Sequence, residues 1–337
     1  MQALLIEGVE SCALHTVGDP TPGPGEVLIN VRHVGLCGSD LATFTGLNPL
    51  VSLPRIPGHE IGAEIINAAP DVPSQYAPGK RVIVIPYTAC GQCSSCRKGR
   101  VNACRYNRTL GVQQNGGLAE RLVLPYSKLI VNDTLPARHL ALVEPLSVGF
   151  HAVARGQVQP GDRVAVIGCG MIGMGAVAGA VAAGAEVIAI DLGSKTEMAL
   201  RYGAKHAIDA GCEDVVAKVN ELTGGDGADV VIEAVGLPAT FTQAIDIACF
   251  AGRVVYIGYS KAPVTYDTKF FNMKELDIHG SRNATEADFS AVISYLEKLD
   301  HSPDDLISKI FPFADAAAAL PYWAGARAST LKILIER

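Results

Sequence analysis

Apolar residues follow two different patterns along the chain. Up to about residue 150, short β-type apolar runs such as 27–31, 81–85 and 122–124 are separated by Pro and Gly turns. This texture predicts a mostly β domain with irregular connections. From about 151 to 283, apolar strand candidates alternate with helical segments, which predicts a parallel, doubly wound sheet with right-handed crossovers.

The second region allows individual elements to be predicted. Its strands are expected at residues 163–167, 186–190, 206–208, 229–233, 253–257 and 276–280, with helices at 196–202, 213–222 and 238–250. The tail predicts a helix over 286–299, a short helix near 315–320 and a final strand over 331–335. We expect the tail to return to the first domain, so that 1–150 and 284–337 form one domain and 151–283 the other.

Composition narrows the class of protein. The chain has 337 residues and a net charge of -6, which suits two domains with separate cores and argues against nucleic-acid binding. The apolar stretch 164–190 divides into strand, turn, helix and strand, so it does not predict a membrane span. Without a recognisable secretory signal, we expect a soluble, cytoplasmic protein. Its nine cysteines are then better explained as metal ligands than as disulfides.

A glycine-rich turn predicts a dinucleotide site. Gly168, Gly170 and Gly173 fit G-x-G-x-x-G directly after an apolar strand, and Met171 and Ile172 begin the helix that follows. The first glycine permits the tight turn, the second lets a pyrophosphate approach the backbone, and the third lets the helix pack on the sheet. The helix N-terminus supplies free N–H groups for the phosphates. The alternative is a βαβ unit that binds no nucleotide.

Asp191 bears on the choice of cofactor. It ends the next strand about 20 residues on, where an acidic side chain binds the adenosine ribose diol. Its carboxylate would repel a 2′-phosphate, although Lys195 is a weak signal in the other direction. NAD is therefore favoured over NADP.

Four cysteines predict a structural zinc site. Cys90, Cys93, Cys96 and Cys104 lie within fifteen residues, among small and polar neighbours. A closed set of four thiolates leaves no position for substrate, so the metal would stabilise the loop. Such sites can supply apparent binding energies on the order of 10 kcal/mol.

A second set of possible metal ligands is dispersed. Cys37, the pair His59 and Glu60, and Glu144 together offer one thiolate, one imidazole and carboxylates, which make a plausible catalytic zinc shell. Taken singly, each residue is explained by an ordinary structural role, such as that of a buried cysteine or of a glutamate at a helix N-terminus. Sequence spacing alone does not bring them together.

These motifs together resemble the zinc-dependent medium-chain dehydrogenases, in the branch of the sorbitol and threonine dehydrogenases. The similarity rests on the following segments, which occur in the family's order: 37–40 (CGSD), 58–60 (GHE), the four-cysteine loop, 144–149 (EPLSVG) and 168–173. Within the branch, residues 85–87, 111–117 and 280–285 look most like bacterial sugar-acid dehydrogenases, which oxidise gulonate or galactonate at C5. The resemblance implies an α/β fold with a mostly β, GroES-like catalytic domain and a Rossmann domain.

The resemblance also implies residue roles. Cys37 and His59 would hold the catalytic zinc, with Glu60 and Glu144 completing or alternating in its shell. Ser39 would receive the proton of the reacting hydroxyl, and Asp40 would fix the orientation of His59. Val148 and Ile172 would contact the nicotinamide ring, and Val235 and Gly236 would border the cofactor. Arg282 and Asn283 would reach the substrate. A loop salt bridge is an equally good reading of Arg282 and Asn283.

The chain departs from this family at the proton relay. Many relatives carry a His five residues after the zinc cysteine, where this chain has Ala42, and Thr43 replaces an aromatic residue common in polyol dehydrogenases. The expected function is hydride transfer from a polyol or sugar-acid alcohol to NAD, with two zinc ions per chain. Alternatives are a threonine-type amino-alcohol or simple diol dehydrogenase, and a non-catalytic NAD-binding redox sensor. Relatives imply a homo-oligomer, a tetramer or dimer, acting on a small-molecule substrate.

Overall fold

The computed structural model describes residues 1–337 as two compact units. The first comprises Met1–Glu144 and Ile293–Arg337, and the second Pro145–Val292. Each has its own hydrophobic core. None of the helices combines the length and apolar character needed to span a bilayer.

The first unit is built around a seven-stranded sheet and a separate β-hairpin. The hairpin is β1 (Gln2–Gly8) with β2 (Ser11–Thr16). The sheet has the order β14-β15-β3-β4-β5-β7, with β6 paired to β3. Its strands are β3 (Glu26–Gly35), β4 (Glu60–Ala68), β5 (Arg81–Val84), β6 (Arg121–Pro125), β7 (Leu129–Val131), β14 (Ile307–Pro312) and β15 (Lys332–Glu336).

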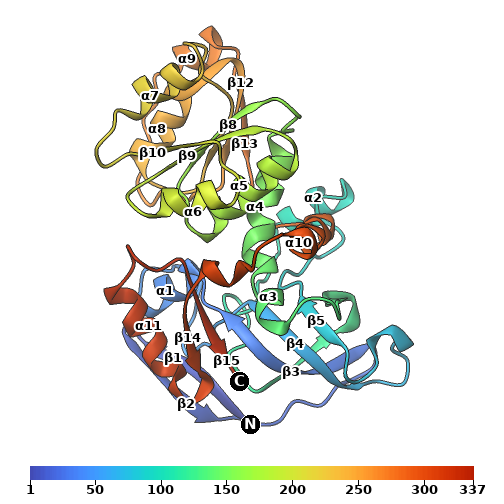
Figure 1. Cartoon of the computed structure of the whole chain (residues 1–337). Coiled ribbons are helices and arrows are strands. Elements are labelled where there is room, and N and C mark those ends of the chain that lie inside the picture. Colours follow the sequence, from blue (N-terminus) through green and yellow to red (C-terminus); the bar gives the residue numbers. More distant parts are fainter. The chain divides into compact units, whose positions relative to one another are not determined.

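Short helices connect these strands. They are α1 (Gly38–Phe44), α2 (Ser94–Arg97), α3 (Ala137–Leu140) and α11 (Ala316–Gly325), while α4 (Val143–Arg155) and α10 (Glu286–Lys298) carry the chain from one unit to the other. The C-terminal segment returns to the first sheet, because β15 pairs antiparallel with β3 and parallel with β14. In Figure 1 the last strands, drawn in red, lie beside the blue N-terminal strands. This return brings residues from both ends of the sequence into one core.

The second unit is a six-stranded parallel sheet with helices on both faces (Figure 1). The strands are β8 (Arg163–Ile167), β9 (Glu186–Asp191), β10 (His206–Asp209), β11 (Ala228–Glu233), β12 (Ala248–Tyr256) and β13 (Asp277–Gly280). The helices are α5 (Met171–Ala182), α6 (Lys195–Arg201), α7 (Val215–Leu222), α8 (Pro238–Ile247) and α9 (Lys269–Met273). The order β10-β9-β8-β11-β12-β13 reverses between β8 and β11, at the point where such sheets bind ligands.

The predicted fold class is confirmed, with one clear error in an element. The expected helix over 238–250 ends at Ile247, because β12 begins at Ala248 and pairs with β11 from that residue on. Ala251, at φ 57, also cannot continue a right-handed helix. Pairing with a neighbouring strand overrides the local helical pattern here.

Candidate functional site

Cys37, His59 and Glu60 meet in the first sheet where β3 ends and β4 begins. Cys37 is the N-cap of α1, just after β3, and His59 lies directly before β4. Antiparallel pairing of Gly35 with Glu60 brings these two strand ends together. One possible ligand atom from each of the three side chains lies within 4.8 Å of the others, and both His59 and Glu60 are buried. The fold thus supplies the convergence that spacing in the sequence could not.

Asp40 ties the two ligand-bearing turns together through the backbone. Its carboxylate accepts hydrogen bonds from the N–H of Cys37 at 2.9 Å and of Gly58 at 3.2 Å. The resemblance assigned Asp40 to the His59 ring, but the Nδ1 of that ring is buried without a hydrogen-bond partner. Asp40 acts on His59 through its charge and through the position of the preceding residue.

Glu144 stands next to this cluster and is held by a residue that the sequence reasoning missed. It lies in the first turn of α4, is buried, and its Oε1 accepts a hydrogen bond from the Tyr87 hydroxyl. Burial raises the pKa of the Glu144 carboxyl and, together with the Glu144 charge, raises the pKa of Tyr87 well above its usual value. Tyr87 therefore remains a hydrogen-bond donor to Glu144. No local pattern in the sequence pairs these two residues.

Lys332 is a second partner that the sequence did not reveal. Its ammonium donates to Glu60 Oε1 at 2.7 Å and Oε2 at 2.6 Å, and to the Leu36 carbonyl at 2.9 Å. Lys332 is 2% exposed and Glu60 1%. A fully buried ion pair of this kind is held by short, well-formed hydrogen bonds.

The donor set suits a divalent cation. Burial alone would lower the pKa of His59, but the Cys37 thiolate and the carboxylates of Asp40 and Glu144 raise it well above its usual value. The surroundings of the imidazole therefore favour a positive charge. Ser39 Oγ and His59 Nδ1 are both buried without a hydrogen-bond partner. Thiolate, imidazole and carboxylate ligands with room for a further group are typical of catalytic zinc sites.

The four-cysteine loop forms a compact cluster of sulfur atoms. The Sγ atoms of Cys90, Cys93, Cys96 and Cys104 lie within 4.8 Å of one another, and none is in a disulfide. The N–H groups of Gln92 and Cys93 donate to Cys90 Sγ, and those of Cys90 and Tyr106 donate to Cys104 Sγ.

The thiol pKa values in this loop diverge. Backbone N–H groups lower the pKa of Cys90, and the Ser95 hydroxyl and backbone N–H groups lower that of Cys93 to about 5. Burial and the neighbouring sulfurs raise the pKa of Cys96 to about 11. Four crowded thiols ionise together only when a cation compensates their charge, which fits a closed metal site.

The glycine turn in the second unit leaves space for a nucleotide. Gly168 has φ 93, and a Cβ there would lie 2.6 Å from Val235. A Cβ on Gly173 would overlap the Gly168 carbonyl oxygen, whereas one on Gly170 would meet nothing within 4 Å. The turn is therefore closed on the protein side and open above Gly170, the N-cap of α5. This cradle fits the approach of a pyrophosphate.

Asp191 ends β9 beside this turn. Its Oδ2 accepts from the Cys169 N–H at 2.6 Å and its Oδ1 from the Leu192 N–H. A carboxylate has further lone pairs, so it can still accept ribose hydroxyls. The side chain is half-buried at the carboxyl edge of the sheet, where the sequence predicted it.

Glu233, which the sequence analysis did not identify, holds the backbone that follows β11, the strand next to β8 in the sheet. At the end of β11, it accepts from the N–H of Val235 at 2.9 Å and of Gly236 at 2.7 Å, and from the Thr240 hydroxyl at 2.7 Å. Val235 is exposed, and Val148 and Ile172, both expected near the nicotinamide, are half-buried. All of them belong to the second unit.

Arg282 and Asn283 follow β13. Arg282 is exposed, and Asn283 adopts a left-handed backbone at φ 53. A non-glycine residue in that conformation often marks a turn with a specific purpose.

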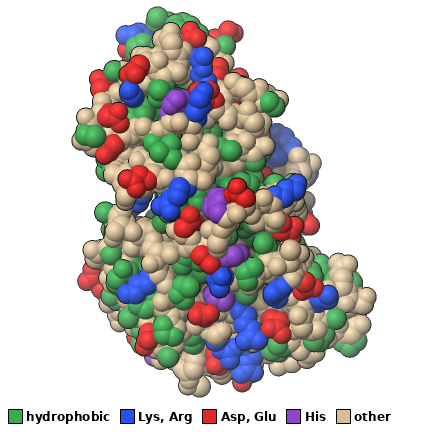
Figure 2. Space-filling model, in the orientation of Figure 1, with side chains coloured by type: hydrophobic (Ala, Val, Ile, Leu, Met, Phe, Trp, Pro, Cys, Tyr) green, Lys and Arg blue, Asp and Glu red, His purple; other side chains and the backbone are tan.

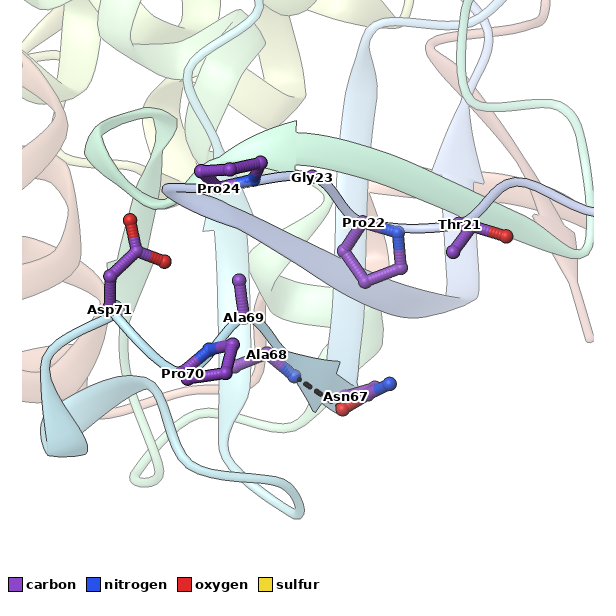
Figure 3. A pocket seen from close by; sticks show the side chains of 9 residues that line it. All are labelled: Thr21, Pro22, Gly23, Pro24, Asn67, Ala68, Ala69, Pro70 and Asp71. Carbon is purple, nitrogen blue, oxygen red and sulfur yellow. Dashed lines mark hydrogen bonds between the residues drawn. The ribbon is translucent and has the colours of Figure 1, made fainter.

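A surface pocket elsewhere in the first unit has no such chemistry. Figure 3 shows it between the segment before β3 and the end of β4, lined by Thr21, Pro22, Gly23, Pro24, Asn67, Ala68, Ala69, Pro70 and Asp71. It includes none of the metal-binding or dinucleotide-binding candidates. On the face drawn in Figure 2, acidic and basic side chains are interspersed. Neither this pocket nor the distribution of surface charge indicates another functional site.

Known proteins resemble this chain over both units. A model described as "Alcohol dehydrogenase GroES-like domain" matches residues 23–134, and one described as "Zinc-binding dehydrogenase" matches 172–298. The L-galactonate-5-dehydrogenase of Escherichia coli is 35% identical over 299 residues, 88% of each chain. The sorbitol dehydrogenase of Halalkalibacterium halodurans is 32% identical over 337 residues, 97% of this chain and 96% of its own.

Solved structures agree in fold. A zinc-binding dehydrogenase from Sinorhizobium meliloti, bound to NADP, has a TM-score of 0.92 and 30% identity, covering 100% of this chain and 99% of its own. The rspB alcohol dehydrogenase of Escherichia coli, complexed with NADH, gives the same TM-score, identity and coverage. Both forms of the dinucleotide thus occur among proteins of this fold.

Proposed function

Because the chain belongs to the zinc-dependent medium-chain alcohol dehydrogenases, in the branch of the sorbitol and threonine dehydrogenases, we propose that it oxidises a secondary alcohol of a polyol or sugar acid, of the gulonate or galactonate kind, with NAD. The observation that carries the proposal is the buried convergence of Cys37, His59 and Glu60. A purely dinucleotide-binding protein has no need of this second cluster.

In this proposal Cys37 and His59 hold the catalytic zinc, and a carboxylate from Glu60 or Glu144 completes the protein's share of the ligands. Once bound, zinc would lower the pKa of the alcohol oxygen that it takes as a ligand, and the dinucleotide would supply the hydride acceptor. The protein's own contribution is to orient the alcohol and to exclude water. The four thiols of the 90–104 loop hold a second, structural zinc.

Ser39 receives the proton of the reacting hydroxyl. Its Oγ is buried without a hydrogen-bond partner, so it is free to accept. Its carbonyl accepts from the Thr43 hydroxyl at 2.8 Å, which holds the first turn of α1 in place. Ala42 offers no onward acceptor. Because a hydroxyl that takes one proton must release its own, that proton passes to Glu60, Glu144 or water and not to the histidine relay of many relatives.

NAD is the proposed dinucleotide. The Asp191 carboxylate stands at the end of β9, where a 2′-phosphate would add a second negative charge at close range. We expect the wild-type protein to prefer NAD, and Asp191→Ala to reduce that preference by weakening NAD and tolerating NADP. Equilibrium titration of both dinucleotides measures this directly.

Arg282 is the proposed partner of a sugar-acid carboxylate. It is exposed on the loop after β13 and carries the permanent charge that a carboxylate ligand requires. Arg282→Ala should raise the KM for an aldonate by about tenfold, the loss expected for one charged hydrogen bond, and leave the KM for a neutral polyol unchanged. An unchanged aldonate KM would remove the support for a sugar-acid substrate.

A screen of NAD reduction tests the proposed function as a whole. The purified protein is assayed with aldonates, neutral polyols, simple diols and hydroxy amino acids, with and without removal of metal by a chelator. The proposal predicts turnover with an aldonate or polyol that disappears on chelation and returns with zinc. Turnover confined to a hydroxy amino acid or a simple diol would favour a threonine-type or diol dehydrogenase, and metal-independent turnover would refute the zinc assignment.

A further inference from the structure

A fully buried carboxylate lies at the end of β11. Glu233 is 0% exposed, and its Oε1 accepts hydrogen bonds from the N–H groups of Val235 and Gly236 and from the Thr240 hydroxyl. Its Oε2 is buried without a hydrogen-bond partner. All three donors are uncharged, and no ion pair compensates the carboxylate. Burying a carboxylate away from any cation lowers the stability of a fold, which makes Glu233 a candidate for a functional role.

Two glycines make room for the Glu233 carboxylate. A Cβ on Gly258 would overlap Glu233 Oε2, and Gly236, at φ 86, turns its N–H to within hydrogen-bond distance of Oε1, at 2.7 Å. The N–H groups of Ile257 and Gly258 also donate to the Glu233 carbonyl, at 2.9 and 3.2 Å. The side chain is therefore enclosed by the turns that follow β11 and β12.

Glu233 lies on the half of the second sheet that begins with β11 and continues with β12. A dinucleotide crosses the point where the strand order reverses, with one nucleotide on each half of the sheet. The glycine turn after β8 and Asp191 at the end of β9 belong to the half that suits the pyrophosphate and the adenosine ribose. The nicotinamide half of the cofactor is therefore expected above the ends of β11 and β12, where Glu233 is buried.

The nicotinamide ring changes its charge during the reaction. The ring is a cation in NAD and becomes neutral in NADH, because the hydride brings an electron pair with its proton. A buried anion nearby stabilises the cationic ring more than the neutral one, since a charge inside a protein is poorly screened. The rest of the dinucleotide is the same in both forms. The ratio of the two affinities therefore reports the electrostatic effect on the ring alone.

We propose that Glu233 is a positioning residue whose negative charge, behind the turn of Val235 and Gly236 that it holds, strengthens the binding of NAD relative to NADH. The carboxylate acts through this turn, because two of the three hydrogen bonds to Oε1 come from the turn's N–H groups. Val235 also lies against the glycine turn, since a Cβ on Gly168 would come within 2.6 Å of its side chain. This inference rests on the proposed function, since it concerns the same dinucleotide site.

Isothermal titration calorimetry with NAD and with NADH tests the inference without relying on turnover. Glu233→Gln keeps the size of the side chain and removes its charge. The ratio of the NAD Kd to the NADH Kd should rise by about tenfold, because loss of the anion weakens binding of the cationic ring. Glu233→Asp keeps the charge on a shorter side chain, so it should weaken both dinucleotides and keep the ratio near its wild-type value.

Thr240 allows a second test that leaves Glu233 in place. Thr240→Lys brings an ammonium to the side of the carboxylate that the hydroxyl contacts at 2.7 Å, where it can neutralise the charge. The Kd ratio should then rise, as in Glu233→Gln. Thr240→Val is the matched control: it removes the same hydrogen bond without adding a charge, and it should change both affinities by the same factor. Asp191→Asn removes a carboxylate from the adenosine half and should also leave the ratio unchanged.

A Glu233→Gln protein with the wild-type Kd ratio would overturn the inference, whatever the change in the two separate affinities. If Glu233→Gln does not fold, equal ratios in Thr240→Lys and Thr240→Val would overturn it. A rise in the ratio shared by Glu233→Gln, Glu233→Asp and Thr240→Val would assign the effect to the shape of the turn and would also contradict the inference. A wild-type protein that binds neither dinucleotide would instead refute the proposed function.

Discussion

The four-cysteine loop and the Cys37 cluster both gather metal-binding side chains in the first unit, but they do so by different means. The loop draws its ligands from fifteen consecutive residues and shapes their sulfurs with its own backbone N–H groups. The Cys37 cluster draws on α1, the start of β4 and the first turn of α4, with Lys332 added from β15. A metal site whose ligands are close together in the sequence can thus be predicted from their spacing. A site whose ligands are far apart in the sequence can be recognised only once the fold is known.

The two clusters are also expected to serve different purposes: the cysteine loop stabilises the fold, and the Cys37 cluster carries out the reaction. A loop with few apolar residues gains its order from the metal that it binds. The dispersed cluster sits on a sheet with an extensive apolar core, which positions the ligands whether or not a metal is bound. We therefore expect substitutions in the two clusters to affect different properties.

The largest effect is expected for Cys37→Ser. Loss of the thiolate should remove the catalytic metal and lower turnover by roughly 10³-fold or more, which is about 4 kcal/mol of barrier. Dinucleotide binding should not change, because the glycine turn belongs to the second unit. Steady-state kinetics with metal analysis and NAD titration measure both. Cys212→Ser alters an exposed thiol outside both clusters and is the control; full activity in Cys37→Ser would end the zinc assignment.

Cys93→Ser should mainly affect stability. The loop should lose its metal, and the free energy of unfolding should fall by several kcal/mol, below the roughly 10 kcal/mol that isolated zinc-binding peptides reach. Chemical denaturation and protease cleavage between residues 88 and 110 report the change. Ser95→Ala removes only the hydroxyl 3.1 Å from Cys93 Sγ, so it should keep the metal and lose about 1 kcal/mol. Equal stability of Cys93→Ser and wild type would mean that the loop needs no metal.

Tyr87→Phe should have the smallest effect of the three. It removes the hydroxyl that donates to the buried Glu144, at a cost of about 1–3 kcal/mol, and should lower turnover by about tenfold. Because burial raises the pKa of Glu144 and the Tyr87 hydrogen bond opposes that rise, the variant should raise this pKa further. The acidic limb of the pH–rate profile should then move to higher pH. A profile that does not move would show that Glu144 takes no part in the reaction.

Much of the fold could be predicted from the sequence, because its signals are local. The strands of the second unit lie close to their predicted bounds, since each is a short apolar run between turn residues. The error at residues 248–250 arose where pairing with β11 outweighed a helical pattern. The glycine turn and the four cysteines were identified for the same reason, because their spacing is itself the signal.

The contacts that complete the dispersed cluster could not be predicted in this way. Nothing near Lys332 marks it as the partner of Glu60, and a lysine in a final strand ordinarily suggests a solvent-facing position. Tyr87 and Glu144 are likewise joined only by the fold. Asp40 was identified, but its hydrogen bonds go to the backbone of Cys37 and Gly58. Buried polar partners at long range are decided by tertiary structure.

Anomalous scattering at the zinc absorption edge, from crystals of the zinc-loaded protein, tests the central claim most directly. The account predicts two peaks per chain: one among the four cysteine sulfurs of the 90–104 loop, and one within about 2.0–2.3 Å of both the Cys37 sulfur and a nitrogen of the His59 ring. A single peak in the cysteine loop, or a second peak away from Cys37 and His59, would contradict it.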